Sequence, residues 1–330
     1  MIGKPKIAFY WASSCGGCEI SLINLHEKLL LVDNHFDLVF CPCIMDTKRK
    51  DVEAMPDGSI AITFFNGAIR TRENEEMAIL MRKKSGLLIA FGACAAGGGI
   101  PALSNFHSRK DHFDTIYLNN PSIDNPDGII PGGKTTVPGG EVELPDFFEQ
   151  VRTLAQTVPI DYIIPGCPPE THRILEVIEH IINGKPLPPR GSVIGAGTKS
   201  VCDECARKKN ENRKIERLVR CHEVIPDTEK CLLEQGLFCM GVATRDGCGA
   251  LCPTANMPCT GCYGPPDGVS DQGAKMAGTI GGLLNFDDLK ELEEQELSRI
   301  IDEKIARIPD FPGMAYKFSL ADSILKKTSE

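Results

Sequence analysis

Short runs of apolar residues recur through the first 190 residues, and amphipathic segments separate them. The apolar runs have the length of buried strands and lie at 5–12, 36–44, 58–69, 86–94 and 161–167. Segments with apolar residues near the helical period lie at 19–31, 73–85 and 169–184. Because apolar strands alternate with helices, the pattern predicts an α/β fold with a parallel sheet covered on both faces.

The pattern changes farther along the chain. Residues 119–145 are rich in Pro, Gly and Asn, which predicts a long surface loop, and KPLPPRG at 185–191 is typical of a linker. Nine of the fifteen cysteines follow residue 200, and 286–308 form an acidic amphipathic segment that predicts a solvated helix. We therefore expect one domain over 1–190 and a second, cysteine-rich and mostly irregular domain over 191–330.

Composition and charge exclude several classes of protein. The 330 residues include 36 basic and 45 acidic side chains, and the formal net charge of -9 argues against binding nucleic acid. No apolar run approaches the roughly 18 residues of a membrane span, and the N-terminus carries no convincing targeting signal. We expect a cytoplasmic protein without membrane contact. In that reducing compartment fifteen cysteines favour metal or cluster binding, with disulfides as the alternative.

The first cysteine set follows the ends of three predicted strands. Cys15 and Cys18 come after the first strand, Cys94 after the fourth and Cys167 after the fifth. Loops at the carboxyl ends of parallel strands form one ligand crevice, so these four thiols should converge. Four thiolates are what an iron–sulfur cube requires. A redox dithiol at Cys15 and Cys18, or four separate buried thiols, are the alternatives.

Three motifs carry a resemblance to a known family. CGGCE at 15–19, GACAAGGG at 92–99 and PGCPPE at 165–170 resemble the electron-transferring small subunit of nickel–iron hydrogenases and, more weakly, the cluster-bearing subunit of complex I. The resemblance implies a flavodoxin-like, doubly wound first domain. It also implies that Cys15, Cys18, Cys94 and Cys167 hold a proximal 4Fe-4S cluster beside the large subunit. Glu19 would lie near the proton exit; alternatively, it is a first-turn acid favoured by the helix dipole.

The second cysteine set has nine members. They are Cys202, Cys205, Cys221, Cys231, Cys239, Cys248, Cys252, Cys259 and Cys262. The segment 229–265 resembles cytoplasmic hydrogenase small subunits of the methyl-viologen-reducing, deazaflavin-non-reducing type. Cys202 stands where many relatives have histidine, and GCGALCP with PCTGC offers four thiols where many have three and a proline.

These departures suggest two further 4Fe-4S clusters, three in all. We assign the distal cluster to Cys202, Cys205, Cys231 and Cys239, and the medial cluster to Cys248, Cys252, Cys259 and Cys262. Cys221 could replace Cys231, and four-thiolate zinc is the alternative for this half of the chain. Cys41 and Cys43 belong to none of these sets and are interpreted as structural or partner-facing.

The chain lacks the signature of a hydrogen-activating site. In this family two Cys-x-x-Cys pairs on the large subunit hold the nickel–iron centre, one with histidine close behind; no Cys-x-x-Cys pair here has that histidine. No phosphate-binding or dinucleotide fingerprint occurs either.

The resemblance therefore implies a subunit that carries electrons from hydrogen oxidation in a nickel–iron large subunit. The acceptors would be an iron–sulfur adaptor and the heterodisulfide reductase of methanogenesis. A deazaflavin-reducing hydrogenase subunit and a zinc-stabilised scaffold without a redox role are the alternatives.

Overall fold

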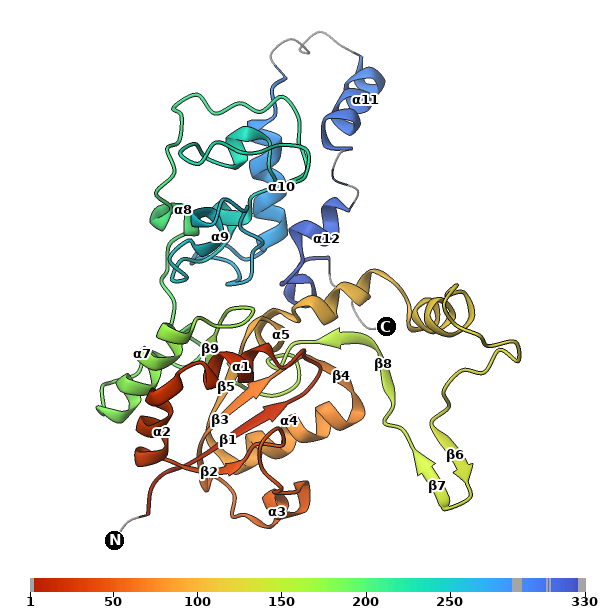
Figure 1. Cartoon of the computed structure of the whole chain (residues 1–330), viewed down its shortest axis with the longest axis vertical. Helices are drawn as coiled ribbons and strands as arrows, with labels where there is room; N and C mark the ends of the chain where they lie inside the picture. Colours follow the sequence, from red (N-terminus) through yellow and green to blue (C-terminus); the bar gives the residue numbers. More distant parts are fainter. Residues whose placement is uncertain (1–2, 287–292, 307, 309, 326–330) are drawn as a thin grey trace. The chain divides into compact units, whose positions relative to one another are not determined.

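Five parallel strands form the central sheet of the first part of the chain (Figure 1). The computed structural model describes residues 3–286, 293–306, 308 and 310–325. The strands are β1 (Lys6–Trp11), β2 (Asp37–Phe40), β3 (Ile60–Asn66), β5 (Ser85–Phe91) and β9 (Tyr162–Ile164). Their order is β2-β1-β3-β5-β9, and all four pairings are parallel. Counted along the chain this is the flavodoxin-like order 2-1-3-4-5, so the predicted α/β class is confirmed.

The helices and the smaller sheets complete this part of the chain. Its helices are α1 (Gly17–Ile23), η1 (His26–Lys28), α2 (Leu29–His35), α3 (Arg49–Ala54), α4 (Arg72–Lys84), α5 (Ala93–Gly97), η2 (Ile100–Phe106), α6 (Arg109–Phe113), η3 (Asp114–Leu118), α7 (Thr171–Ile182) and η7 (Leu320–Asp322). Two antiparallel pairs accompany them, β4 (Ile69–Thr71) with β8 (Phe147–Arg152), and β6 (Lys134–Val137) with β7 (Gly140–Glu143).

Successive residues of each strand point to opposite faces of the sheet, and an apolar layer covers each face. On one face Phe9 and Phe64 stack with ring centroids 4.7 Å apart, and helices α1 and α7 cover this layer. On the other face Tyr10 and Phe65 pack beneath α3 and α4. Because both faces are buried, the strands are apolar almost throughout, which explains the unbroken runs in the sequence.

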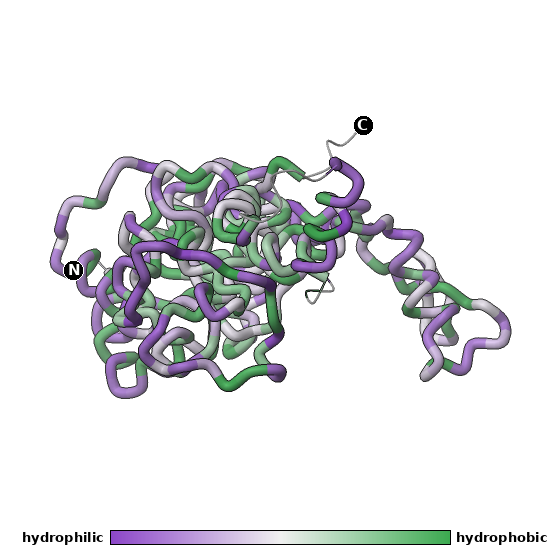
Figure 2. Tube along the Cα trace, turned by 90° about the horizontal axis from the view of Figure 1, so that it is seen from above, coloured by the Kyte–Doolittle hydropathy of each residue, from purple (hydrophilic) through white to green (hydrophobic). Residues whose placement is uncertain are grey.

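Two local predictions differ from the structure. The helix expected over 19–31 is interrupted, because His26 has φ 51, a left-handed value that cannot continue an α-helix. The loop expected over 119–145 contains the β6–β7 hairpin, whose strands are exposed along their whole length. The hairpin belongs to an arm that leaves the sheet (Figures 1 and 2), and Ile129 and Leu144 on it are exposed.

The second part of the chain is built from short helices and long irregular segments. Its helices are α8 (Val201–Glu204), η4 (Leu233–Gln235), η5 (Met240–Ala243), α9 (Leu251–Thr254), α10 (Gln272–Leu283), α11 (Glu294–Ile305) and α12 (Phe311–Ala315). Isolated β-bridges such as Val219 with Leu237 join its loops. The helix expected over 286–308 corresponds to α11, while residues 287–292 and 307 of that prediction lie outside the described residues.

The chain divides into two compact units. The first comprises Met1–Ile194 with Leu320–Glu330, and the second comprises Gly195–Ser319. The last described residues pack within the first unit, where Gln156 Nε2 donates a hydrogen bond of 2.7 Å to the Ala321 carbonyl. Within the described ranges, none of the helices combines the length and the apolar composition needed to cross a membrane.

The buried aromatic layer should carry much of the stability of the first unit. Phe65 in β3 is fully buried, so Phe65→Ala should lower the free energy of unfolding by about 3–5 kcal/mol. Leu30, which is 66% exposed, is the matched control, and Leu30→Ala should cost less than about 0.5 kcal/mol. Urea titration of the anaerobically purified chain measures both, and a small loss for Phe65→Ala would contradict the packing described.

Candidate functional site

Four thiols lie together beyond the carboxyl edge of the sheet. Cys15 and Cys18 follow β1, Cys94 lies in α5 directly after β5, and Cys167 follows β9. Burial raises the pKa of Cys94 to about 12, with further contributions from the charges of Cys167 and Cys15. Burial also raises the pKa of Cys18, and Glu19 and the other three thiols add to that shift. The thiols of this set therefore act electrostatically on one another, as the strand-end argument predicts for one crevice.

Backbone hydrogen bonds hold the turns that carry these thiols. The Gly92 N–H donates to the Ile164 carbonyl at 2.8 Å, and the Ala93 N–H donates to the Gly166 carbonyl at 2.7 Å. The turn after β5 is thereby tied to the turn after β9. The Ile100 backbone and the Ser14 side chain also hydrogen-bond Cys94, which partly offsets the rise in its pKa.

Two glycines leave room for sulfur. A Cβ on Gly92 would lie 2.4 Å from Cys18 Sγ, and one on Gly99 would lie 2.6 Å from Cys94 Sγ. Both residues have positive φ, 87 and 56, a region that L side chains rarely adopt. Glycine is therefore required at these positions by two independent constraints.

Glu19 is buried in the first turn of α1 beside this thiol set. Both of its carboxylate oxygens accept hydrogen bonds of 2.7 Å from Asn66 Nδ2, at the end of β3. Its charge also acts on Cys41 and Cys43, whose pKa values are raised chiefly by burial. The Cys41 and Cys43 pair thus lies near Glu19, with Cys41 buried and Cys43 exposed.

A second thiol set lines a cavity in the second unit. The cavity contacts Cys202, Cys205, Cys231 and Cys239. Burial raises the pKa of Cys202 to about 12; the Cys239 charge adds to this, and the Lys209 charge opposes it. Cys221, the possible substitute for Cys231, is exposed in a turn. Cys231 lines the cavity and Cys221 does not, and the choice between them as a ligand stays a prediction.

Contacts link some of the four cysteines assigned to the medial cluster. Cys259 and Cys262 interact electrostatically, and the Cys259 N–H donates to Cys239 Sγ at 3.3 Å. Cys248 precedes α9 and donates from Sγ to Glu204 Oε1 at 3.6 Å, while Cys252 lies within α9. The grouping of Cys248, Cys252, Cys259 and Cys262 stays a prediction.

The donor chemistry of the two convergent sets fits iron–sulfur clusters. All fifteen cysteines are free thiols, and thiolate sulfur is the ligand that such clusters require. Buried thiols with raised pKa values are costly to ionise without a metal, which supplies the compensating charge. Among the described residues, no three His, Cys, Asp or Glu side chains are arranged to hold a single metal ion.

Some residues around the thiols were not found from the sequence. Asn66 hydrogen-bonds Glu19, the residue after Cys18, and Glu204, Arg207 and Lys209 approach cysteines of the second unit. A signal existed for Asn66, because it ends an apolar strand at the edge where the thiols converge. Arg207 and Lys209 closely follow Cys205 in the sequence, and that proximity could have identified them.

Comparison with known proteins defines the class. The profile of the family described as NADH ubiquinone oxidoreductase, 20 Kd subunit, matches residues 15–181. A NiFeSe hydrogenase from Desulfovibrio vulgaris Hildenborough in the oxidized state aligns with a TM-score of 0.50 at 17% identity, covering 81% of this chain and 96% of that chain. A likeness at this identity shows the fold alone.

Sequence relatives give a narrower family. The F420-non-reducing hydrogenase iron-sulfur subunit of Archaeoglobus profundus is 38% identical over 327 residues, 98% of both chains. The corresponding vhu subunit of the F420-non-reducing hydrogenase of Methanocaldococcus jannaschii is 36% identical over 326 residues, again 98% of both. The chain belongs to this family of F420-non-reducing hydrogenase iron–sulfur subunits, which are subunits of nickel–iron hydrogenases. The resemblance inferred from the three cysteine motifs is thereby confirmed, F420 being a deazaflavin.

The requirement for glycine at position 92 can be tested against Gly58, another glycine with positive φ. Gly58 has φ 70 with nothing within 4 Å of an added Cβ, so Gly58→Ala should cost only about 1–2 kcal/mol of left-handed strain. Gly92 has φ 87 and ψ 165, a region almost restricted to glycine, and an added Cβ would also lie against Cys18 Sγ, so Gly92→Ala should lower the free energy of unfolding further. Urea titration compares the two variants, and equal losses would show that the Cys18 sulfur moves freely.

Proposed function

We propose that this chain is the electron-transfer subunit of a nickel–iron hydrogenase and holds three 4Fe-4S clusters. Electrons from hydrogen oxidation would come from a nickel-bearing large subunit and pass onward to an iron–sulfur adaptor and heterodisulfide reductase. The observation that carries the proposal is the convergence of Cys15, Cys18, Cys94 and Cys167 from three strand ends, in a chain of this family. When bound, such clusters supply one-electron transfer.

The partial exposure of the first thiol set suits electron exchange with a partner subunit. Cys18 and Cys94 are buried and exclude water, whereas Cys15 and Cys167 are exposed. Nearby Trp11 is 43% exposed, and its ring lies 3.5 Å from the Cβ position of Gly16. An exposed indole beside exposed ligand thiols suits docking by another subunit, because large aromatic side chains are enriched at interfaces.

In the second unit the proposal assigns two clusters. Cys202, Cys205, Cys231 and Cys239 would hold the distal one around the cavity that they line. Cys248, Cys252, Cys259 and Cys262 would hold the medial one. The Cys259 N–H bond to Cys239 Sγ connects the two proposed ligand sets, which supports short steps for electrons within this unit.

The proposal includes Glu19 as a proton-path residue. Its carboxylate is buried, follows Cys18 directly, and is oriented by two hydrogen bonds from Asn66. A carboxylate in that position can accept or release a proton beside the first thiol set. The cytoplasmic location and the link to methanogenesis stay predictions from the sequence.

Loss of one ligand should distinguish the first thiol set from the other cysteines. Cys94→Ala should remove about four of about twelve irons per chain and lower hydrogen-dependent viologen reduction by the assembled complex at least 10–100-fold. Cys43→Ala is the control, because Cys43 lies outside all three proposed sets. Iron analysis and the viologen assay measure both variants. Equal losses in complexes that still assemble would show that the ligand assignment is wrong.

The identity of the metal in the second unit decides between a relay and a zinc scaffold. The anaerobically purified chain should contain about twelve irons and as many sulfides, absorb broadly in the visible, and give paramagnetic signals when reduced. Zinc has no redox chemistry, so a zinc-bearing second unit would leave only about four irons. Elemental analysis with about two zinc ions and about four irons would reject the relay through this unit.

A further inference from the structure

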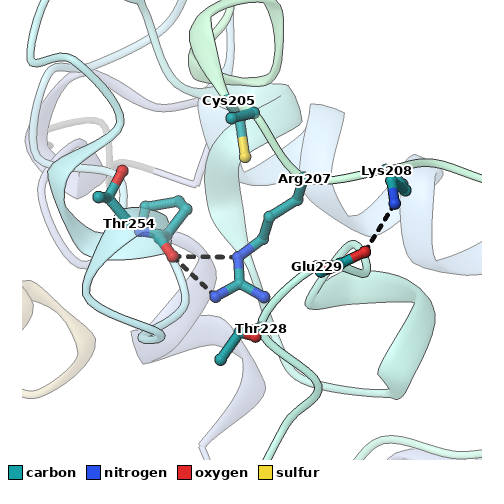
Figure 3. Close-up of a pocket in the computed structure, with 8 residues that line it drawn as sticks. Cys205, Arg207, Lys208, Thr228, Glu229 and Thr254 are labelled. Carbon is teal, nitrogen blue, oxygen red and sulfur yellow. Dashed lines mark hydrogen bonds and ion pairs between the residues drawn. The ribbon is translucent and has the colours of Figure 1, made fainter.

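Arg207 is a buried cation without an anionic side-chain partner in the hydrogen bonds that hold it. It is only 9% exposed, and its guanidinium makes five hydrogen bonds, all to neutral oxygens. Nε and Nη2 donate to the Pro253 carbonyl at 3.0 and 2.9 Å, as the dashed lines in Figure 3 show. The other acceptors are the carbonyls of Asp227 and Lys230 and the Asn256 side chain.

Two other cations of the second unit, Arg245 and Lys208, do have carboxylate partners. Arg245, also buried, pairs with Asp267 at 2.6 Å. Lys208, one residue after Arg207, is exposed and pairs with Glu229 at 2.6 Å, which is visible in Figure 3. Buried charges in proteins are normally paired, because an isolated ion in a low-dielectric interior is costly. Neutral carbonyl and amide oxygens therefore hold the Arg207 guanidinium, and none of these hydrogen bonds goes to a carboxylate that would balance its charge.

The thiol cavity supplies a balancing anion when metal is bound. Arg207 and Lys209 line the same cavity as Cys202, Cys205, Cys231 and Cys239. Figure 3 shows Cys205 and Arg207 at a second pocket, which shares these two residues with the thiol cavity and is lined also by Lys208, Thr228, Glu229 and Thr254. Lys209 donates to the Cys202 carbonyl, and its charge acts on the Cys202 thiol. Two cations thus adjoin four thiols whose ligated form is anionic.

The environment of Cys248 has the opposite sign. The Glu204 carboxylate accepts hydrogen bonds from the Gly247 and Ala250 N–H groups and from Cys248 Sγ. Two cations therefore line the cavity of the Cys202 set, where the charge of Lys209 also acts on the exposed Asp203, and the Glu204 carboxylate adjoins Cys248. One-electron reduction adds a negative charge, breaks no bond and requires no proton, so a nearby cation favours the reduced state and a nearby anion opposes it.

We propose that Arg207 is the counter-ion of the group held by Cys202, Cys205, Cys231 and Cys239 and raises its reduction potential. This inference rests on the proposed function. Within the second unit the electron then resides preferentially at this site, because the Cys248 site lies beside Glu204. Lys209 adds to the effect with a second, less buried charge.

The test is a redox titration of the full chain, purified anaerobically and monitored by electron paramagnetic resonance. Arg207→Gln should lower the midpoint of one cluster by at least a tenfold change in its reduction equilibrium, about 59 mV for a one-electron couple. The affected signal is assigned by its loss in Cys202→Ala. Lys208→Gln, which removes an exposed and paired charge, should leave every midpoint unchanged.

A charge effect must be separated from loss of the hydrogen bonds. Arg207→Lys keeps the charge and loses most of the bonds, so its midpoint should stay near that of the natural chain. If Arg207→Lys and Arg207→Gln shift alike, the effect is structural and the inference is overturned. Should Arg207→Gln lose iron, Lys209→Gln provides the measurement: a lowered midpoint supports the inference and an unchanged one overturns it.

Iron content distinguishes failure of the proposed function from failure of the inference about Arg207. A natural chain with only about four irons overturns the proposed function, and the inference falls with it. A chain with about twelve irons whose midpoints do not respond to Arg207→Gln overturns the inference and leaves the proposed function intact.

Discussion

The close approach of four sulfur atoms at one edge of the sheet is the constraint that shapes the first unit. Burial and mutual charge raise the pKa values of Cys18, Cys94 and Cys167, so these thiols resist ionisation until a metal compensates them. The chain must therefore hold them together against a cost. Parallel strands do this because their carboxyl ends are fixed side by side by the sheet hydrogen bonds, and glycine turns let sulfur approach the backbone.

The second unit meets the same requirement without a sheet. Its loops are joined by buried polar side chains that bridge distant segments. Arg207 connects 227–230 with 253–256, and Gln272 in α10 donates to the Gly261 carbonyl at 2.9 Å. Such bonds have a fixed geometry, and each one left unmade would cost about 1–3 kcal/mol. The polar network thus takes over the positioning that strands provide in the first unit, and it brings charge close to the thiols.

The features that were predicted from the sequence are those that follow from regular periodicity and from the spacing of cysteines. The apolar runs indicated the strands, and their ends indicated the convergence of the first thiol set, because a parallel sheet places carboxyl ends together. The interruption of the helix at His26 was missed because no local sequence pattern predicts a left-handed backbone at a histidine. The β6–β7 hairpin was missed because its Pro and Gly content resembles that of a loop. Arg207 and Lys209 closely follow Cys205 in the sequence, but the contacts that these charged groups make could not be predicted from it. Glu204 reaches Cys248 far along the chain, and the lack of a carboxylate partner for Arg207 depends on acceptors from two other segments.

The division of the chain has a consequence for its synthesis. The first unit is interrupted by the whole of the second, and its last piece is supplied by residues after 319. In that piece Ala321 packs against Gly98, where an added Cβ would lie 2.5 Å from the Ala321 Cβ. Because a polypeptide leaves the ribosome from its N-terminus, this piece is made after the whole second unit. The contact of Ala321 with the turn that follows Cys94 can therefore form only after roughly two hundred later residues have been made.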